Sequence, residues 1–151
     1  NAYYWMLDLA GLAEEAEQTE EAVSWLKQAF DGAEGAATRI QWGAYYVDGL
    51  TRMAADDAPG IAAAAVTVLG EPAAQDDPVY GRNKGAVKRI ARALNKWAVG
   101  GEDEDSTEVD RTGRPEVMAA ITDRFDAICT THFESGDKLD ACVSLFRPAE
   151  A

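Results

Sequence analysis

Apolar residues recur every three or four positions along most of this chain, and this spacing predicts helices. Within residues 19–30 they fall at i, i+3, i+4 and i+7, on one helical face, as Ala22, Trp25, Leu26 and Ala29. Residues 3–16 show similar spacing, and only the polar pair Glu17-Gln18 separates the two segments. Together they predict a helical hairpin over residues 3–31.

The same spacing continues along the chain and predicts further helices. A second hairpin is expected over residues 36–69. Asp56, Asp57 and Pro59 mark the start of its second helix, because Asp caps helices and Pro suits the first turn. Asp77 and Pro78 form the same kind of start and predict a long helix over residues 77–98. A flexible acidic loop over 99–115 and a C-terminal hairpin over 116–147 complete the predicted order.

These elements predict an all-α fold, a single helical domain over residues 1–151 in which antiparallel hairpins stack into an array of about seven helices. The first hairpin resembles a tetratricopeptide repeat, which folds about 34 residues into two antiparallel helices. The resemblance rests on residues at the offsets of that repeat, namely Leu9, Ala10, Ala13, Ala22, Leu26 and Ala29. The second hairpin matches only loosely, because Tyr46 stands where a small residue is expected.

A tetratricopeptide-like stack implies a peptide-binding groove, because the first helix of each pair then lines a concave surface. The residues expected on that surface are Tyr4, Leu7, Gly11, Glu14, Gln41, Tyr45 and Asp48. Aromatic and polar side chains on one helical face suit the recognition of a protein or peptide. The alternative is that these residues form an ordinary helix surface.

The charge of the chain narrows the choice of partners. A formal net charge of −13 disfavours nucleic acid, whose phosphates require a basic face. One basic ladder stands out against this acidic background at i, i+4 spacing: Lys84, Lys88, Arg92 and Lys96. It is either a solvated face that offsets the acidic chain or pairs with the acidic loop residues 102–105, or it is a dock for an acidic partner. No apolar run reaches the length of a membrane span, so none is expected.

Cys129 and Cys142 are the two cysteines of the chain, and they flank the turn of the C-terminal hairpin. In an antiparallel hairpin the two positions come roughly level on apolar stripes, so a disulfide between them is expected. Two buried free thiols are the alternative. A disulfide in turn predicts an oxidising compartment, periplasmic or extracytoplasmic.

Other chemistry finds little support in the sequence. Cys129 and His132 could form part of a zinc site, but a carboxylate such as Asp126 or Glu134 would have to complete the ligands. The chain has no Cys-x-x-Cys motif and no Gly-x-Ser-x-Gly elbow. We therefore expect no catalytic residue, no metal and no cofactor in this chain.

Three phrases resemble the helical region that follows the thioredoxin-like domain in some bacterial, exported thioredoxin-family proteins. They are Tyr3-Tyr4-Trp5-Met6-Leu7-Asp8-Leu9-Ala10, Glu21-Ala22-Val23-x-Trp25-Leu26 and Thr38-Arg39-x-Gln41-Trp42-Gly43. The resemblance implies a C-terminal accessory domain of a thiol–disulfide protein, cut or processed from a longer chain. Its partner would then include its own thioredoxin-like domain, and the parent protein would be the oxidoreductase.

The expected function is a non-catalytic, helical protein- or peptide-interaction domain. Two other classes stay open. One is a metal-binding or enzymatic domain that uses Cys129 and His132, and the other is a purely structural oligomerisation module.

Overall fold

The structure is a computed structural model that describes residues 2–100 and 109–147. The described part contains seven helices and no strand, which confirms the predicted all-α fold. The helices are α1 (Ala2–Glu15), α2 (Thr19–Gly32), α3 (Ala36–Met53), α4 (Ala58–Ala73), α5 (Arg82–Val99), α6 (Arg114–His132) and α7 (Asp137–Ser144). The tetratricopeptide-like character of their arrangement stays a prediction. The acidic residues 102–105 of the expected loop lie outside the described residues.

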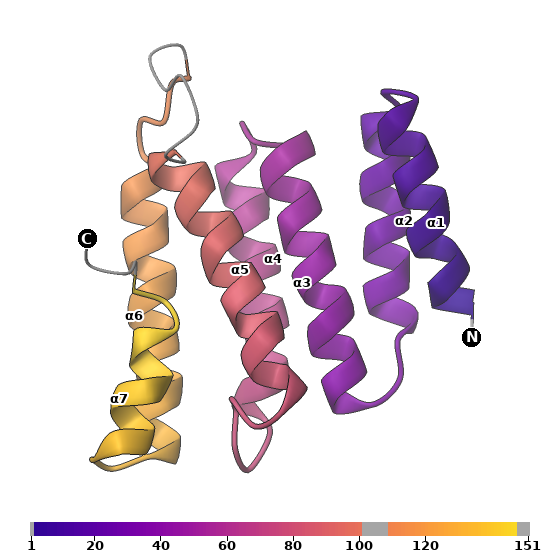
Figure 1. Ribbon diagram of the computed structural model, residues 1–151. Helices are drawn as coiled ribbons and strands as arrows, with labels where there is room; N and C mark the ends of the chain where they lie inside the picture. The colour runs from indigo at the N-terminus through magenta and orange to yellow at the C-terminus, as the bar shows by residue number, and fades with distance from the viewer. Residues whose placement is uncertain (1, 101–108, 148–151) are drawn as a thin grey trace.

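The helices form an array with α1 and α2 at one end and α6 and α7 at the other (Figure 1). Helix α2 packs against α3, and α3 packs against both α4 and α5. Helix α6 then packs on α4 and α5, and α7 packs on α6. Within the described residues, the backbone of α1 lies close to that of α2 alone, and the backbone of α7 lies close to that of α6 alone.

A continuous hydrophobic core runs through the array from α2 to α7. The predicted apolar face of α5 is buried: Val87, Ile90, Ala91, Leu94 and Trp97. At the end of the core, the rings of Phe125 and Phe146 stack with their centroids 4.5 Å apart, and both side chains are buried. This contact anchors the segment after α7 on α6.

A buried arginine ties three parts of the core together. Arg114, at the start of α6, donates a hydrogen bond to the carbonyl of Trp97 at 3.2 Å, and its guanidinium lies over the Trp97 ring. The indole N–H of Trp97 in turn donates to the carbonyl of Ala55 at 2.8 Å, in the turn between α3 and α4. Helix α5 is thereby held at its C-terminal end against both neighbours.

The start of α4 is confirmed as the sequence predicts. The carboxylate of Asp57 accepts a hydrogen bond from the backbone N–H of Gly60 at 3.1 Å, and Pro59 lies in the first turn. The end of the second hairpin was predicted too early, because α4 continues past residue 69 to Ala73 and includes the buried Pro72. Pro72 has no backbone N–H to donate, but it lies in the last turn of α4. The helix therefore loses only one hydrogen bond, near its end.

The predicted start of the long helix at residue 77 is wrong. Asp77 accepts a hydrogen bond from the backbone N–H of Val79 at 3.0 Å, which closes a local turn and does not cap a helix. Gly81 then adopts a φ of +56°, in the region that favours glycine, and α5 begins at Arg82. The buried side chain of Asn83 donates to Gln75 at 2.7 Å and fixes this connection.

None of the helices within residues 2–100 and 109–147 combines the length and apolar character that a membrane span requires.

Candidate functional site

A hollow of about 230 Å³ lies between α1, α3 and α5. It is lined by Leu7, Ala10, Gly11, Glu14, Leu26, Tyr45, Asp48, Arg52 and Arg89. Helices α1 and α3 both pack on α2, but among the described helices their backbones do not approach each other. Leu26 of α2 forms the floor between them. It packs so closely on α3 that a Cβ atom on Gly49 would collide with it, and Gly49 therefore lets α2 and α3 pack tightly while α1 stands apart.

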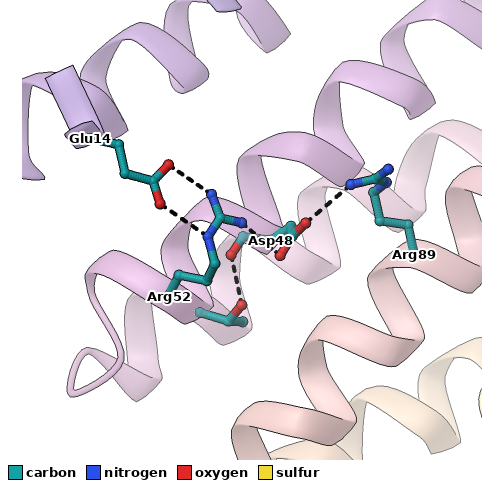
Figure 2. A network of polar contacts seen from close by, with 5 residues as sticks. Glu14, Asp48, Arg52 and Arg89 are labelled. Carbon is teal, nitrogen blue, oxygen red and sulfur yellow. Dashed lines mark hydrogen bonds and ion pairs between the residues drawn. The ribbon is translucent and has the colours of Figure 1, made fainter. Parts of the chain in front are cut away.

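An ion-pair network crosses this hollow and links the three helices (Figure 2). Arg52 donates two hydrogen bonds to the Glu14 carboxylate, from Nε at 3.2 Å and from Nη2 at 3.0 Å. Its Nη1 lies 2.9 Å from Asp48, and Asp48 also contacts Nη1 of Arg89 at 3.2 Å. The hydrogen bond to Glu14 raises the pKa of Arg52 most strongly, with Asp48 adding to it. Charges therefore alternate from α1 to α5 along the row Glu14, Arg52, Asp48, Arg89.

Aromatic side chains also connect α1, α3 and α5. The guanidinium of Arg89 lies over the Tyr45 ring, 4.7 Å from its centroid, in cation–π geometry. The buried Trp42 ring meets the rings of Tyr3 and Tyr4 edge to face, at centroid distances of 5.6 Å and 5.4 Å. Side chains thus bridge α1 and α3 where the backbones do not.

The structure brings five of the seven predicted groove residues to this one hollow: Leu7, Gly11, Glu14, Tyr45 and Asp48. Tyr4 stands beside it on the Trp42 ring and is 57% exposed. Gln41 is exposed on α3 outside the lining. Sequence reasoning did not assign Arg52 and Arg89 to the site. The i, i+4 spacing of Asp48 and Arg52 could have indicated the first of them.

A second hollow of about 380 Å³ adjoins the first along α5. It shares Asp48 and Arg89 with the first hollow and adds Gly85, Arg92, Ala93 and Lys96. The combined surface therefore changes from aliphatic and aromatic beside α1 to basic beside α5.

The predicted basic ladder divides between two surfaces of α5. Lys84 and Lys88 line another groove, between α5 and α7, and Lys96 lines the hollow toward α3. Arg92 lines both. All four side chains are exposed.

Cys129 and Cys142 form a disulfide that joins α6 to α7, with their Cα atoms 5.8 Å apart. Both residues are buried. The ring nitrogens of His132 lie 3.0 Å and 3.3 Å from the carbonyl oxygens of Ala73 and Asp76. His132 therefore contacts the end of α4 and the chain that follows it.

These contacts bear on the zinc alternative. The sulfur of Cys129 is bonded to Cys142 and offers no thiolate, and thiolate is the form of cysteine that binds zinc. In the part of the chain that the structure describes, no group of three or more His, Cys, Asp or Glu side chains is placed to hold a metal.

Comparison with protein-family models, with curated proteins and with solved structures finds no match for this chain. The class of the protein is therefore defined by its fold, an all-α array of seven helices in the described residues, with a polar and aromatic hollow across α1, α3 and α5. The resemblance to the helical region of thioredoxin-family proteins stays a prediction from three sequence phrases, and so does the extracytoplasmic location.

Proposed function

We propose that this protein is a non-catalytic interaction domain that binds a segment of a partner protein across α1, α3 and α5. The observation that carries the proposal is the hollow in which five predicted groove residues meet the Glu14–Arg52–Asp48–Arg89 network. Peptide-binding sites commonly combine an apolar pocket with a few fixed polar groups, and this hollow has both.

The two adjoining hollows indicate the chemistry of the segment. The first, at about 230 Å³, has the size for one large apolar side chain, with Leu7, Leu26 and the Tyr45 ring around it. The second presents Arg89, Arg92 and Lys96, which favour a carboxylate. A segment with one large apolar residue followed by acidic residues fits this order.

Gly11 gives a sharp test of the site. A Cβ atom on Gly11 would meet nothing within 4 Å, so a larger side chain fits there and fills the hollow without disturbing the packing of α1. Leucine also has a higher helix propensity than glycine, so Gly11→Leu should fold at least as well as the unsubstituted protein. Gly70→Leu is the matched control, because Gly70 is equally open on α4, away from the hollow.

The experiment selects 12-residue peptides from a random display library for binding to the unsubstituted protein and measures their affinity by fluorescence anisotropy. We expect selected peptides to carry a large apolar residue followed by acidic ones. Gly11→Leu should weaken their binding at least tenfold, and Gly70→Leu should leave it within about twofold, since a filled pocket excludes the apolar anchor. If the selected peptides bind Gly11→Leu as tightly as they bind the unsubstituted protein, the hollow is not the binding site.

A further inference from the structure

A larger groove, of about 670 Å³, lies between α5 and α7. Its α5 wall consists of Lys84, Lys88, Ala91, Arg92 and Asn95, and its other wall and floor consist of Ala141, Ser144, Leu145, Phe146 and Arg147. Helices α5 and α7 both pack on α6, but among the described helices they do not pack on each other. The groove is therefore the space left open where two helices share one neighbour.

Three of the four cations that line this groove have no acidic partner among the described residues. Lys84, Lys88 and Arg92 have neither an ion pair nor a side-chain hydrogen bond with any described residue, although the chain carries 27 acidic residues. Arg147 adds a fourth cation from the opposite wall, 2.9 Å from Asp126. Between the cations, the half-buried Leu145 supplies apolar surface, and the buried Ala91 and Phe146 lie beneath it at the floor. A merely solvated basic face would not require an apolar floor or a second wall.

We propose that this groove binds an acidic amphipathic helix of a partner protein. Residues at i, i+4 and i+8 on α5 are about 6 Å apart along the axis, which matches carboxylates at the same spacing on a second helix. Alternate residues of an extended strand are about 6.6–6.8 Å apart and match this spacing less closely. A partner helix would lay its apolar face on Leu145 and on the alkyl stems of the groove lysines, and its acidic edge along Lys84, Lys88 and Arg92.

The charge of the whole chain favours a short acidic segment over an extended polyanion. The net charge of −13 repels a membrane surface or a nucleic acid over long distances, whereas a bound helix experiences mainly the cations next to it.

The disulfide makes one wall of this groove conditional on oxidation. Helix α7 has only eight residues and packs on α6 alone among the described helices, so it cannot hold its position by helix propensity. The bond from Cys142 to Cys129 fixes α7 on α6 and thereby places Leu145, Phe146 and Arg147 opposite the ladder. Binding of the acidic helix should therefore weaken when the disulfide is reduced.

The probe is a fluorescein-labelled, 18-residue leucine-based helical peptide with glutamates at i, i+4 and i+8, which match Lys84, Lys88 and Arg92. A scrambled peptide of the same composition, which has no aligned glutamates, is its control. We expect the aligned peptide to bind at least tenfold more tightly than the scrambled one at 50 mM NaCl. The affinity should fall at 300 mM NaCl and fall at least fivefold after reduction with a phosphine.

Two charge-matched variants locate the site. Lys84→Glu with Lys88→Glu should weaken the aligned peptide at least tenfold. This variant should fold well, since Lys84 lies in the first turn of α5, where a helix favours acidic residues. Arg82→Glu with Lys138→Glu makes the same change of net charge on α5 and α7 outside the groove lining, and it should cost no more than about threefold.

Several outcomes would overturn the proposal. Equal loss in both double variants would mean that overall charge alone attracts the peptide. Equal binding of the scrambled peptide, or no binding by either, would remove the aligned acidic helix as the occupant. Phosphatidylserine vesicles that bind through Lys84 and Lys88, where the peptide does not, would assign the groove to a membrane surface. Arg92 lines both the α5–α7 groove and the hollow toward α3, but Gly11, Lys84 and Lys88 each line one site alone. Gly11→Leu should therefore leave this peptide unaffected, and the two proposals are tested separately.

Discussion

Reduction of the Cys129–Cys142 disulfide should lower the free energy of unfolding by about 3 kcal/mol. The two cysteines are 13 positions apart, and a closed loop of this size restricts the unfolded chain by about that amount in the chain-entropy model. The loss should appear first as local opening at the C-terminal end. Besides the disulfide, this end is held by the stacked Phe125–Phe146 pair, by Leu139, Val143 and Leu145, which are only partly buried against the core, and by the exposed Arg147–Asp126 ion pair. An exposed ion pair contributes at most about 1 kcal/mol.

Urea unfolding followed by tryptophan fluorescence and circular dichroism, with and without a phosphine reductant, measures the effect. With a urea dependence of about 2 kcal/mol per M, the midpoint should fall by about 1.5 M on reduction. Cys129→Ala with Cys142→Ala should show a similarly low midpoint that no longer responds to reductant. Hydrogen exchange should increase most in α7 and the adjoining end of α6. A midpoint that reduction shifts by less than about 0.3 M would refute the reasoning, because α7 would then be held by packing alone.

Two further predictions concern packing and titration. Gly43→Ala would place a Cβ atom 2.5 Å from Cγ1 of Val68, so the free energy of unfolding, measured in urea, should fall by about 1–3 kcal/mol. Gly70 is open, so Gly70→Ala should raise it by up to about 1 kcal/mol. Equal effects would contradict the close approach of α3 and α4. Hydrogen bonds from the Thr112 side chain and backbone lower the pKa of Asp110, so Thr112→Val should raise it toward the ordinary value in a carboxyl NMR titration. Because the pKa of Asp110 is lower in the folded state, the contact with Thr112 stabilises the fold at pH values above the unfolded pKa. This stabilisation is lost as the pH falls through the folded pKa. An unchanged titration midpoint of Asp110 in Thr112→Val would contradict this explanation.

Most of the fold could be predicted from the sequence because the relevant information is local. The buried face of α5 repeats with helical spacing, and the same spacing gives α2 its buried Ala22, Leu26 and Ala29. An aspartate cap at the start of α4 could also be predicted from Asp56, Asp57 and Pro59. The structure shows that the cap is Asp57, whose carboxylate accepts from an N–H three residues away.

The start of α5 could not be predicted correctly because two local structures use the same residue type. An aspartate that caps a helix and an aspartate that closes a turn both accept a hydrogen bond from a backbone N–H two or three residues ahead. Asp77 closes a turn, and Asn83 fixes the connection through Gln75. Gly81, with its positive φ, was the sequence feature that could have indicated the later start.

The candidate site was predictable in its outline and not in its charges. Placing Glu14 and Asp48 on one surface requires only the order of the hairpins. The pairing of Asp48 with Arg89 joins residues 41 positions apart and depends on how closely α3 and α5 pack, which no local pattern contains. Arg52 lies between, paired locally with Asp48 and across the gap with Glu14.

The two grooves arise in the same way and differ in charge. Helices α1 and α3 share α2 as a neighbour, and α5 and α7 share α6, so each pair leaves a space between its members. Across the first space Arg52 bonds to Glu14, and the hollow there measures about 230 Å³. The second is lined by Lys88 and Arg92 from α5 and by Arg147 from the other wall, and the groove measures about 670 Å³. Like charges on both walls cannot bond to each other, whereas carboxylates on a partner helix would bridge α5 and α7 as Glu14 bridges α1 and α3.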